Sequence, residues 1–265
     1  MMYKVIDHLG RSMILPQSPK RIISICPAIT ETLFSLGLEK EIVGRTKYCI
    51  FPKGTVEQVP VVGGTKDVDL DKIKELQPDL IFAEKEENTE EIVKELEKIA
   101  PVFVLEVKSI KDAYRLITTL GEVTKNTETA HLLLTACQKS FQSIVGKENG
   151  KAAYVIWRKP YMVVGGTTYI CDVLHTMGFQ NPFTNEDSRY PVITKEQLAN
   201  AKLDKLFLAS EPFPFQQKHL SEFQSFLPHT EIILVDGEMF WYGSRMLVAG
   251  EYLAKLAIDQ QKPLA

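Results

Sequence analysis

The chain has 265 residues, of which 45% are hydrophobic and 25% are charged, and its formal net charge is −3. This composition is typical of a globular protein with a sizeable core, in one large domain or two smaller ones. A pI near 6.0 argues against a nucleic-acid partner. No apolar run approaches the 18 residues of a membrane-spanning helix. The N-terminus shows no secretory signal, so either the protein is cytosolic or a leader has been removed.

In the first half of the chain, strand-like and helix-like segments alternate, which predicts a parallel sheet covered by helices on both faces. The continuous apolar run at residues 21–26 is typical of a strand buried on both faces. The predicted strands are residues 3–6 and 12–15 (a hairpin), 21–26, 42–44, 59–62, 80–83 and 102–105. The predicted helices are residues 28–36, 69–77, 88–99 and 109–123.

A longer helix is predicted at residues 126–148. Asn126 is a good N-cap, and Gly146 and Gly150 are plausible stop signals. At roughly 1.5 Å per residue this helix is ~33 Å long, so it could be a strut between two lobes at residues 1–125 and 149–265. An ordinary crossover helix inside one domain is the alternative. Its apolar positions recur at helical spacing and are Ala130, Leu133, Leu134, Cys137, Phe141, Ile144 and Val145.

The second half repeats the α/β pattern without an obvious sequence repeat. The segment 211–215 (EPFPF) must be extended, because Pro disfavours helix for itself and for the residue before it. The predicted strands are residues 152–157, 161–164, 205–209 and 231–235, and a polar loop is predicted at 180–191. The predicted helices are residues 168–177, 194–201, 219–226 and 243–260.

Motifs for catalysis or for a protein-ligated metal ion are missing from the sequence. The five histidines are scattered, and the glycine pairs at 63–64 and 165–166 lack the other glycines of a nucleotide fingerprint, so we interpret them as tight turns. The acidic residues around 84–97 are interpreted as a solvated helix face. Cys26 and Cys137 are interpreted as small buried hydrophobes, whereas the redox states of these two and of Cys49 and Cys171 stay open.

Aromatic residues stand next to arginines in loops that follow predicted strands. The loops of a parallel sheet gather beyond the carboxyl ends of the strands, where ligands bind. Flat aromatic rings and bidentate Arg suit a large, flat, partly anionic ligand. The alternative is that both tryptophans belong to the core. The three sites are Trp157-Arg158, Arg189-Tyr190 and the run from Phe240 through Trp241 and Tyr242 to Arg245.

An ordered set of short motifs resembles the substrate-binding proteins of ABC importers for vitamin B12 and ferric siderophores, and it covers nearly the whole chain. These motifs are Asp7-x-Leu9-Gly10-Arg11, Pro19-x-Arg21-Ile22-x-Ser24, Pro27-x-x-Thr30-Glu31-x-Leu33-x-x-Leu36-Gly37, Val43-Gly44, Pro52, Pro60-Val61-Val62-Gly63 and Asp71-Lys72-Ile73-x-x-Leu76-Gln77-Pro78-Asp79-Leu80-Ile81.

The resemblance implies an α/β fold of two Rossmann-like lobes, with mainly parallel sheets, joined by one long helix. It implies that a ligand binds between the lobes, and alignment with vitamin B12 binders puts cleft positions at Tyr48, Trp157, Trp241 and Arg245. It also implies that one surface acid on each lobe, Asp71 and Glu196, docks the permease; ordinary solvated helix acids are the alternative.

Three departures from the family pattern are visible. Asp71 stands where a glutamate is usual in the family. Thr65-Lys66 lies near where a B12 binder carries another cleft aromatic. The third departure is the missing secretory signal peptide. The second departure argues modestly against cobalamin itself.

We therefore expect a non-catalytic, monomeric binding protein without a cofactor or bare metal site, located in the cell envelope. Its ligand should be a metal chelate: a ferric siderophore, a corrinoid or haem. The proposed ligand-binding residues are Tyr48, Trp157, Arg189, Tyr190, Trp241, Tyr242 and Arg245. A cytosolic chelate carrier or sensor on the same fold, and an enzyme that uses the cleft, are the alternatives.

Overall fold

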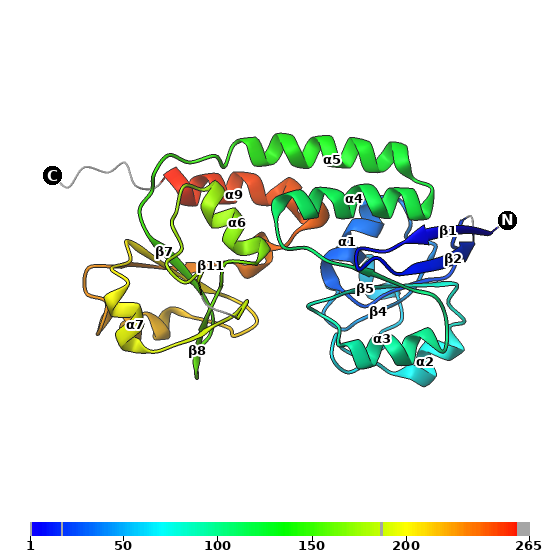
Figure 1. The fold of residues 1–265 in the computed structure, drawn as a ribbon, viewed down its shortest axis with the longest axis horizontal. Coiled ribbons are helices and arrows are strands. Elements are labelled where there is room, and N and C mark those ends of the chain that lie inside the picture. Colours follow the sequence, from blue (N-terminus) through cyan, green and yellow to red (C-terminus); the bar gives the residue numbers. More distant parts are fainter. Residues whose placement is uncertain (1, 17, 186–187, 259–265) are drawn as a thin grey trace. The chain divides into compact units, whose positions relative to one another are not determined.

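The computed structural model describes residues 2–16, 18–185 and 188–258. The chain divides into two compact units. Unit 1 comprises Met1–Val107 and Lys111–Cys137, and unit 2 comprises Lys108–Ile110 and Gln138–Ala265. Each unit contains a mainly parallel sheet with helices, which confirms the predicted fold class (Figure 1).

Unit 1 contains a four-stranded parallel sheet in the order β4-β3-β5-β6 and a separate antiparallel hairpin, β1-β2. The hairpin turn is held by the Asp7 carboxylate, which accepts the N–H groups of Leu9 (3.0 Å) and Arg11 (2.9 Å). The strands are β1 (Met2–Ile6), β2 (Ser12–Pro16), β3 (Ile22–Ser24), β4 (Ile42–Arg45), β5 (Leu80–Glu84) and β6 (Val102–Leu105).

Two helices of unit 1, α2 and α3, begin at residues whose side chains cap them. The Asp69 carboxylate accepts the N–H of Lys72 at 3.0 Å, and the Thr89 hydroxyl accepts that of Ile92 at 3.3 Å. The helices are α1 (Pro27–Ser35), the 3-10 helix η1 (Val56–Gln58), α2 (Leu70–Glu75), α3 (Glu90–Glu97), α4 (Ile110–Thr124) and α5 (Thr127–Gln142), of which α5 continues into unit 2.

The strand predicted at residues 59–62 is wrong. Only an isolated bridge between Arg45 and Val61 forms there, beside β4. Pro60 offers its carbonyl oxygen to the Arg45 N–H at 3.0 Å but has no N–H of its own, so the ladder cannot continue through it.

Unit 2 contains a five-stranded sheet in the order β11-β10-β7-β8-β9. β7, β10 and β11 are parallel, whereas β8 is antiparallel to both of its neighbours. The two-residue strand β9 follows Pro191 and was not predicted, because so short a strand has no periodicity. The strands are β7 (Ala152–Trp157), β8 (Tyr161–Val163), β9 (Val192–Ile193), β10 (Lys205–Ala209) and β11 (Glu231–Val235).

The last helix of unit 2 differs from its predicted range of 243–260. Its first three residues form a separate 3-10 helix, and residues 259 and 260 lie outside the described part of the chain. The helices are α6 (Tyr169–Thr176), α7 (Lys195–Asn200), η2 (Gln217–His219), α8 (Leu220–Gln224), η3 (Gly237–Phe240), η4 (Gly243–Arg245) and α9 (Met246–Ile258).

The helix α5 is shorter than predicted: it ends at Gln142 rather than near residue 148. Beyond it, the Ser143 hydroxyl and the Ser143 N–H both donate to the Ser140 carbonyl, at 2.6 and 3.3 Å. The Gly146 N–H then bonds to the Thr176 carbonyl at 3.0 Å, which draws the chain toward the end of α6. Val145, which was assigned to the apolar stripe, is consequently 71% exposed.

Two glycines allow neighbouring helices to approach α5 closely. A Cβ atom added to Gly121 of α4 would lie 2.3 Å from the Ala130 Cβ, within unit 1. A Cβ atom added to Gly250 of α9 would lie 2.1 Å from the Ser140 hydroxyl oxygen, within unit 2. Both distances are impossible for real side chains, so the helix packing requires glycine at these positions.

All four cysteines are buried and form no disulfide. Burial raises the pKa of the Cys49, Cys137 and Cys171 thiols, to about 12 for Cys137. The interpretation of Cys26 and Cys137 as small buried hydrophobes is confirmed.

The contact between Gly121 and Ala130 yields a stability prediction. We expect Gly121→Ala to lower the free energy of unfolding by about 1–2 kcal/mol, because overpacking costs more than the roughly 1 kcal/mol that Ala gains in helix propensity. Urea denaturation of the variant measures this loss. The double variant Gly121→Ala/Ala130→Gly, which removes the opposing methyl group, should recover part of it. A stabilised single variant would contradict the close approach of α4 and α5.

Candidate functional site

The predicted ligand-binding residues follow strands at the carboxyl end of each sheet. In unit 1, Tyr48 lies three residues beyond the end of β4. In unit 2, Trp157 is the last residue of β7, and the segment that contains Trp241 and Arg245 follows β11. In α/β sheets this is the end at which loops collect and ligands bind.

Tyr48 is the most exposed of the predicted aromatic contacts. Its side chain is 52% exposed and rests on Gly64, where an added Cβ would lie 3.2 Å from the Tyr48 Cε2. The Lys47 ammonium lies 5.2 Å from the centre of the tyrosine ring. Ile50, two residues further on, is 37% exposed. Unit 1 therefore presents a small apolar surface with a cation beside it.

A buried polar network lies at the ends of β3 and β5. The Asn88 amide donates to the carbonyl oxygens of Ile25 (3.2 Å) and Thr65 (2.9 Å), and its oxygen accepts the Glu84 N–H at 2.8 Å. Thr65 itself is buried. Near the place where the resemblance to B12 binders leads us to expect another cleft aromatic, this chain therefore has a buried residue, Thr65, whose carbonyl oxygen accepts a hydrogen bond from Asn88.

Glu84 corrects the interpretation of the acidic run as a solvated face. It closes β5, is only 1% exposed, and its carboxylate accepts the N–H groups of Glu86 (2.7 Å), Glu87 (3.1 Å) and Val107 (3.2 Å). Burial raises the pKa of Glu84 to about 7, although the N–H donors of Glu86 and Glu87 act in the opposite direction. The exposed acids of α3 fit the original interpretation.

In unit 2, Trp157 is exposed rather than part of the core. Its side chain is 39% exposed and packs edge-on against Phe213, with the ring centres 5.8 Å apart. Phe213 also donates its N–H to the Ile156 carbonyl at 3.2 Å, which fixes the extended segment after β10 beside the end of β7.

The neighbouring arginine is committed to the protein itself. The Arg158 guanidinium forms an ion pair with Glu222 of α8 at 2.6 Å, and Tyr161 donates its hydroxyl proton to the same carboxylate. Burial would raise the pKa of Glu222, but the hydrogen bonds from Tyr161 and Arg158 outweigh it, so this pKa is lowered. Arg158 therefore anchors the β7–β8 turn to α8.

Trp241 is half-buried, and its indole N–H donates to the Glu211 carboxylate. Glu211 and Phe213 both belong to the loop after β10. In the sheet, the strand β10 lies between β11 and β7. This loop thus contacts both tryptophans, through Glu211 on one side and Phe213 on the other. Tyr242 stacks edge-on against Tyr169, with ring centres 5.7 Å apart.

The remaining predicted residues are less accessible. Arg189 and Tyr190 are half-buried, and Arg245 is only 7% exposed within η4. The Arg189 carbonyl accepts the Gly165 N–H at 2.8 Å. A Cβ at Gly165 would lie 2.7 Å from the Ser188 carbonyl oxygen, so this glycine allows the chain to pack closely against the loop before β9.

Asp71 and Glu196 occupy equivalent helix positions. Each is the second residue of a helix, α2 in unit 1 and α7 in unit 2, and both are exposed. Asp71, whose side chain is 90% exposed, pairs with Lys74 at 3.2 Å. The Glu196 carboxylate accepts hydrogen bonds from its own N–H and from the Thr194 hydroxyl, and these lower its pKa. Acidic side chains in the first turn of a helix also interact favourably with the helix dipole, so the position of Asp71 and Glu196 has a structural explanation as well.

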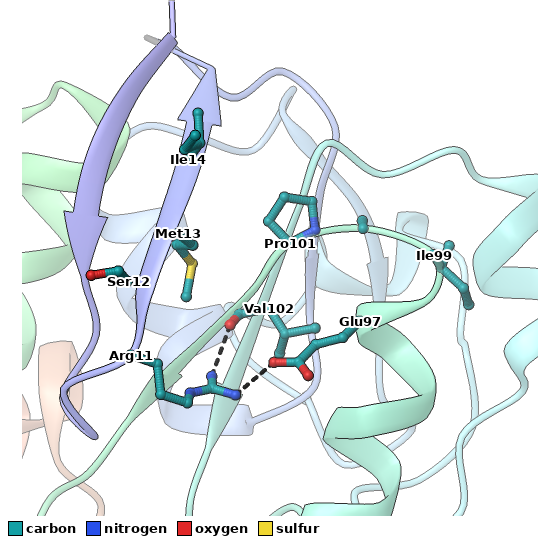
Figure 2. Close-up of a pocket in the computed structure, with 9 residues that line it drawn as sticks. Arg11, Ser12, Met13, Ile14, Glu97, Ile99, Pro101 and Val102 are labelled. Carbon is teal, nitrogen blue, oxygen red and sulfur yellow. Dashed lines mark hydrogen bonds and ion pairs between the residues drawn. The ribbon is translucent and has the colours of Figure 1, made fainter.

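A hollow of about 430 Å³ lies elsewhere in unit 1, between β2 and the amino end of β6, and Figure 2 shows the residues that line it. The Arg11 guanidinium crosses it to Glu97 (2.6 Å) and to the Val102 carbonyl (3.0 Å). Its position at the amino end of β6 separates it from the loops that carry Tyr48 and Glu84.

Within the described residues, His, Cys, Asp and Glu side chains nowhere form a group that could hold a metal ion. None of the helices described is both long and apolar enough to cross a bilayer.

Three residues that organise these loops were not predicted from the sequence: Arg45, Glu84 and Glu222. Arg45 and Glu84 are charged residues at the ends of the buried strands β4 and β5, and a charge directly after an apolar run can be recognised in the sequence. Glu222 gave no signal, because its partner Arg158 is 64 residues away in the chain.

Known proteins resemble this chain along most of its length. A family model described as periplasmic binding protein matches residues 22–232. The vitamin B12-binding protein of Vibrio parahaemolyticus is 26% identical over 198 residues, which cover 71% of this chain and 70% of that protein.

Two solved structures share the fold. The periplasmic heme-binding protein BhuT in complex with two hemes has a TM-score of 0.79 at 20% identity, covering 91% of this chain and 98% of that one. The petrobactin-binding protein YclQ from Bacillus subtilis has a TM-score of 0.78 at 18% identity, covering 99% of this chain and 100% of that one.

The raised pKa of Glu84 predicts a pH dependence of stability. A carboxyl group with a pKa of about 4.5 in the unfolded chain and about 7 in the folded one favours folding most at low pH, and this contribution declines as the pH rises from 4.5 to 7. For this shift the decline is on the order of 3 kcal/mol. We expect wild type to lose stability between pH 5 and 8 relative to Glu84→Gln, measured by urea denaturation at both pH values. Parallel pH profiles would contradict the shift.

Proposed function

The chain belongs to the periplasmic binding protein family and is a substrate-binding protein of the ABC-importer type, and we propose that its substrate is a metal chelate held by exposed aromatic side chains. The observation that carries this proposal is the exposure of Tyr48 and Trp157 at the carboxyl ends of their strands. Exposed aromatic side chains at such positions suit a binding surface, because their rings offer a large, rigid contact area.

The aromatic side chains at the carboxyl ends of the strands favour a broad, flat ligand. Trp157 and the half-buried Trp241 flank one loop in unit 2, and their rings are oriented by Phe213 and Glu211. Rings held in place before binding lose little conformational entropy when a ligand arrives. A corrinoid, haem or aromatic siderophore complex presents a face that such rings can cover.

The arginines contribute less than the sequence pattern suggested. The charge of Arg158 is paired with that of Glu222, and Arg245 is only 7% exposed. Arg189 with Tyr190, and Tyr242 with Arg245, remain proposed contacts. We infer that aromatic contact supplies most of the affinity and that charge supplies a smaller part.

The proposal extends to delivery. Family members pass their substrates to an ABC permease, and the exposed acids Asp71 and Glu196 are suited to bind arginines of that permease. Such a carrier works in the cell envelope and needs no catalytic turnover. Identical helix positions for the two acids support a common role.

Ligand binding tests the first part of the proposal. The wild-type protein is titrated calorimetrically with hemin, dicyanocobinamide and a ferric tris-catecholate complex. For the chelate that binds, we expect Trp157→Ala to weaken binding about 5- to 30-fold, because roughly 1–2 kcal/mol of apolar contact is lost.

Val248→Ala removes two methyl groups from an exposed apolar side chain on α9 in the same unit and should leave the affinity unchanged. If none of the three chelates binds, or if both variants weaken binding equally, a chelate site at Trp157 is refuted.

Transport tests the second part. Asp71→Lys and Glu196→Lys should each retain chelate affinity but reduce the stimulation of ATP hydrolysis by the importer in liposomes at least tenfold, because an attractive contact becomes a repulsive one. Glu251→Lys, which reverses an exposed charge on α9, serves as the control. Full stimulation by both docking variants would reject the proposed role of these acids.

A further inference from the structure

The loop that follows β4 alternates exposed and buried side chains. Tyr48 and Ile50 are 52% and 37% exposed, whereas Cys49 between them is 1% exposed. Residues 46–49 form a turn, closed by the hydrogen bond from the Cys49 N–H to the Thr46 carbonyl at 3.1 Å, which buries Cys49 and leaves Tyr48 at the surface. The loop therefore exposes the apolar side chains of Tyr48 and Ile50, while Cys49 between them is buried.

Arg45 is the residue that holds it. It is 8% exposed, and its guanidinium donates to three main-chain carbonyl oxygens: those of Val56 (2.7 Å), Cys49 (3.1 Å) and Thr46 (3.2 Å). Thr46 and Cys49 lie on either side of Tyr48, and Val56 lies at the far end of the loop. One planar group thus ties both ends of the loop to the end of β4.

Cys49 adds a second attachment. Its sulfur lies 3.1 Å from the Thr30 hydroxyl of α1 and 3.2 Å from the Thr46 hydroxyl. Its burial raises the pKa of the thiol, so the sulfur stays neutral at physiological pH. This attachment fixes the residue next to Tyr48 but does not reach the far end of the loop.

We infer that Arg45 is a positioning residue, which presets Tyr48 and Ile50 in the orientation that a ligand meets. This inference rests on the proposed function of Tyr48 as a ligand contact. Carbonyl groups that are held by a buried guanidinium cannot be satisfied by an apolar replacement, so the loop would populate other shapes without it. Apparent affinity falls in proportion to the fraction of molecules whose loop has the binding shape.

The first measurement follows the loop in the protein without ligand. Hydrogen exchange is recorded for the amides of Cys49 and Val56, which bond to Thr46 and Pro52 within the loop. In Arg45→Met we expect exchange of these two amides to accelerate at least tenfold, while the amides of β5 and β6 are unchanged. Arg45→Lys keeps the charge but loses the planar fork, so it should give an intermediate rate.

The second measurement is a double-mutant cycle on chelate affinity. For the chelate that binds wild type, Arg45→Met should weaken binding about tenfold if the loop keeps its binding shape a tenth of the time. Because Arg45 acts through Tyr48, the losses in Arg45→Met and Tyr48→Ala should not add in the double variant. Arg45→Lys should recover part of the affinity, which a general loss of stability would not explain.

The outcomes separate the two proposals. If no chelate binds wild type, the proposed function fails, and hydrogen exchange alone decides whether Arg45 orders the loop. Exchange that is unchanged in both Arg45 variants overturns the inference. Additive losses in the cycle also overturn it, because Arg45 would then affect binding independently of Tyr48.

Discussion

The loops beyond the strand ends depend on one constraint: their buried main-chain groups need hydrogen-bond partners that the sheet no longer supplies. Charged side chains at or near the strand ends meet this need. Arg45 donates to three carbonyl groups of its loop, and Glu84 accepts three N–H groups from two segments. Arg158 acts less directly, through Glu222 on α8. In each case a charged side chain stabilises the protein's own chain.

Because these charged groups are bound within the protein, the aromatic rings of Tyr48 and Trp157 are the more accessible groups near the carboxyl ends of the strands. Tyr48 belongs to the loop that Arg45 holds in place, and Trp157 lies beside the turn that Arg158 anchors to α8. The loop after β10 orients the tryptophan on each of its sides with a different group, a phenyl ring for Trp157 and a carboxylate for Trp241. In the proposed binding surface, Tyr48, Trp157 and Trp241 are thus positioned by contacts within the protein itself.

The sequence predicted most of the framework because buried strands and amphipathic helices leave periodic traces. It failed where tertiary contacts overrode the local pattern: Gly146 is drawn to Thr176, which ends α5 early, and Pro60 interrupts a strand that its neighbours favoured. The exposure of Trp157 agreed with the sequence interpretation. The pairing of Arg158 with Glu222 could not have been predicted, because a contact across 64 residues has no local signature.

The burial of every cysteine has a practical consequence for spectroscopy. Only the thiolate form reacts quickly with maleimides, and burial disfavours that form at neutral pH. A single cysteine introduced at an exposed position, such as Leu132 of α5, would then carry a fluorophore or spin label without removal of the native thiols. Distances between such labels can follow the protein during its transport cycle while its native thiols stay unmodified.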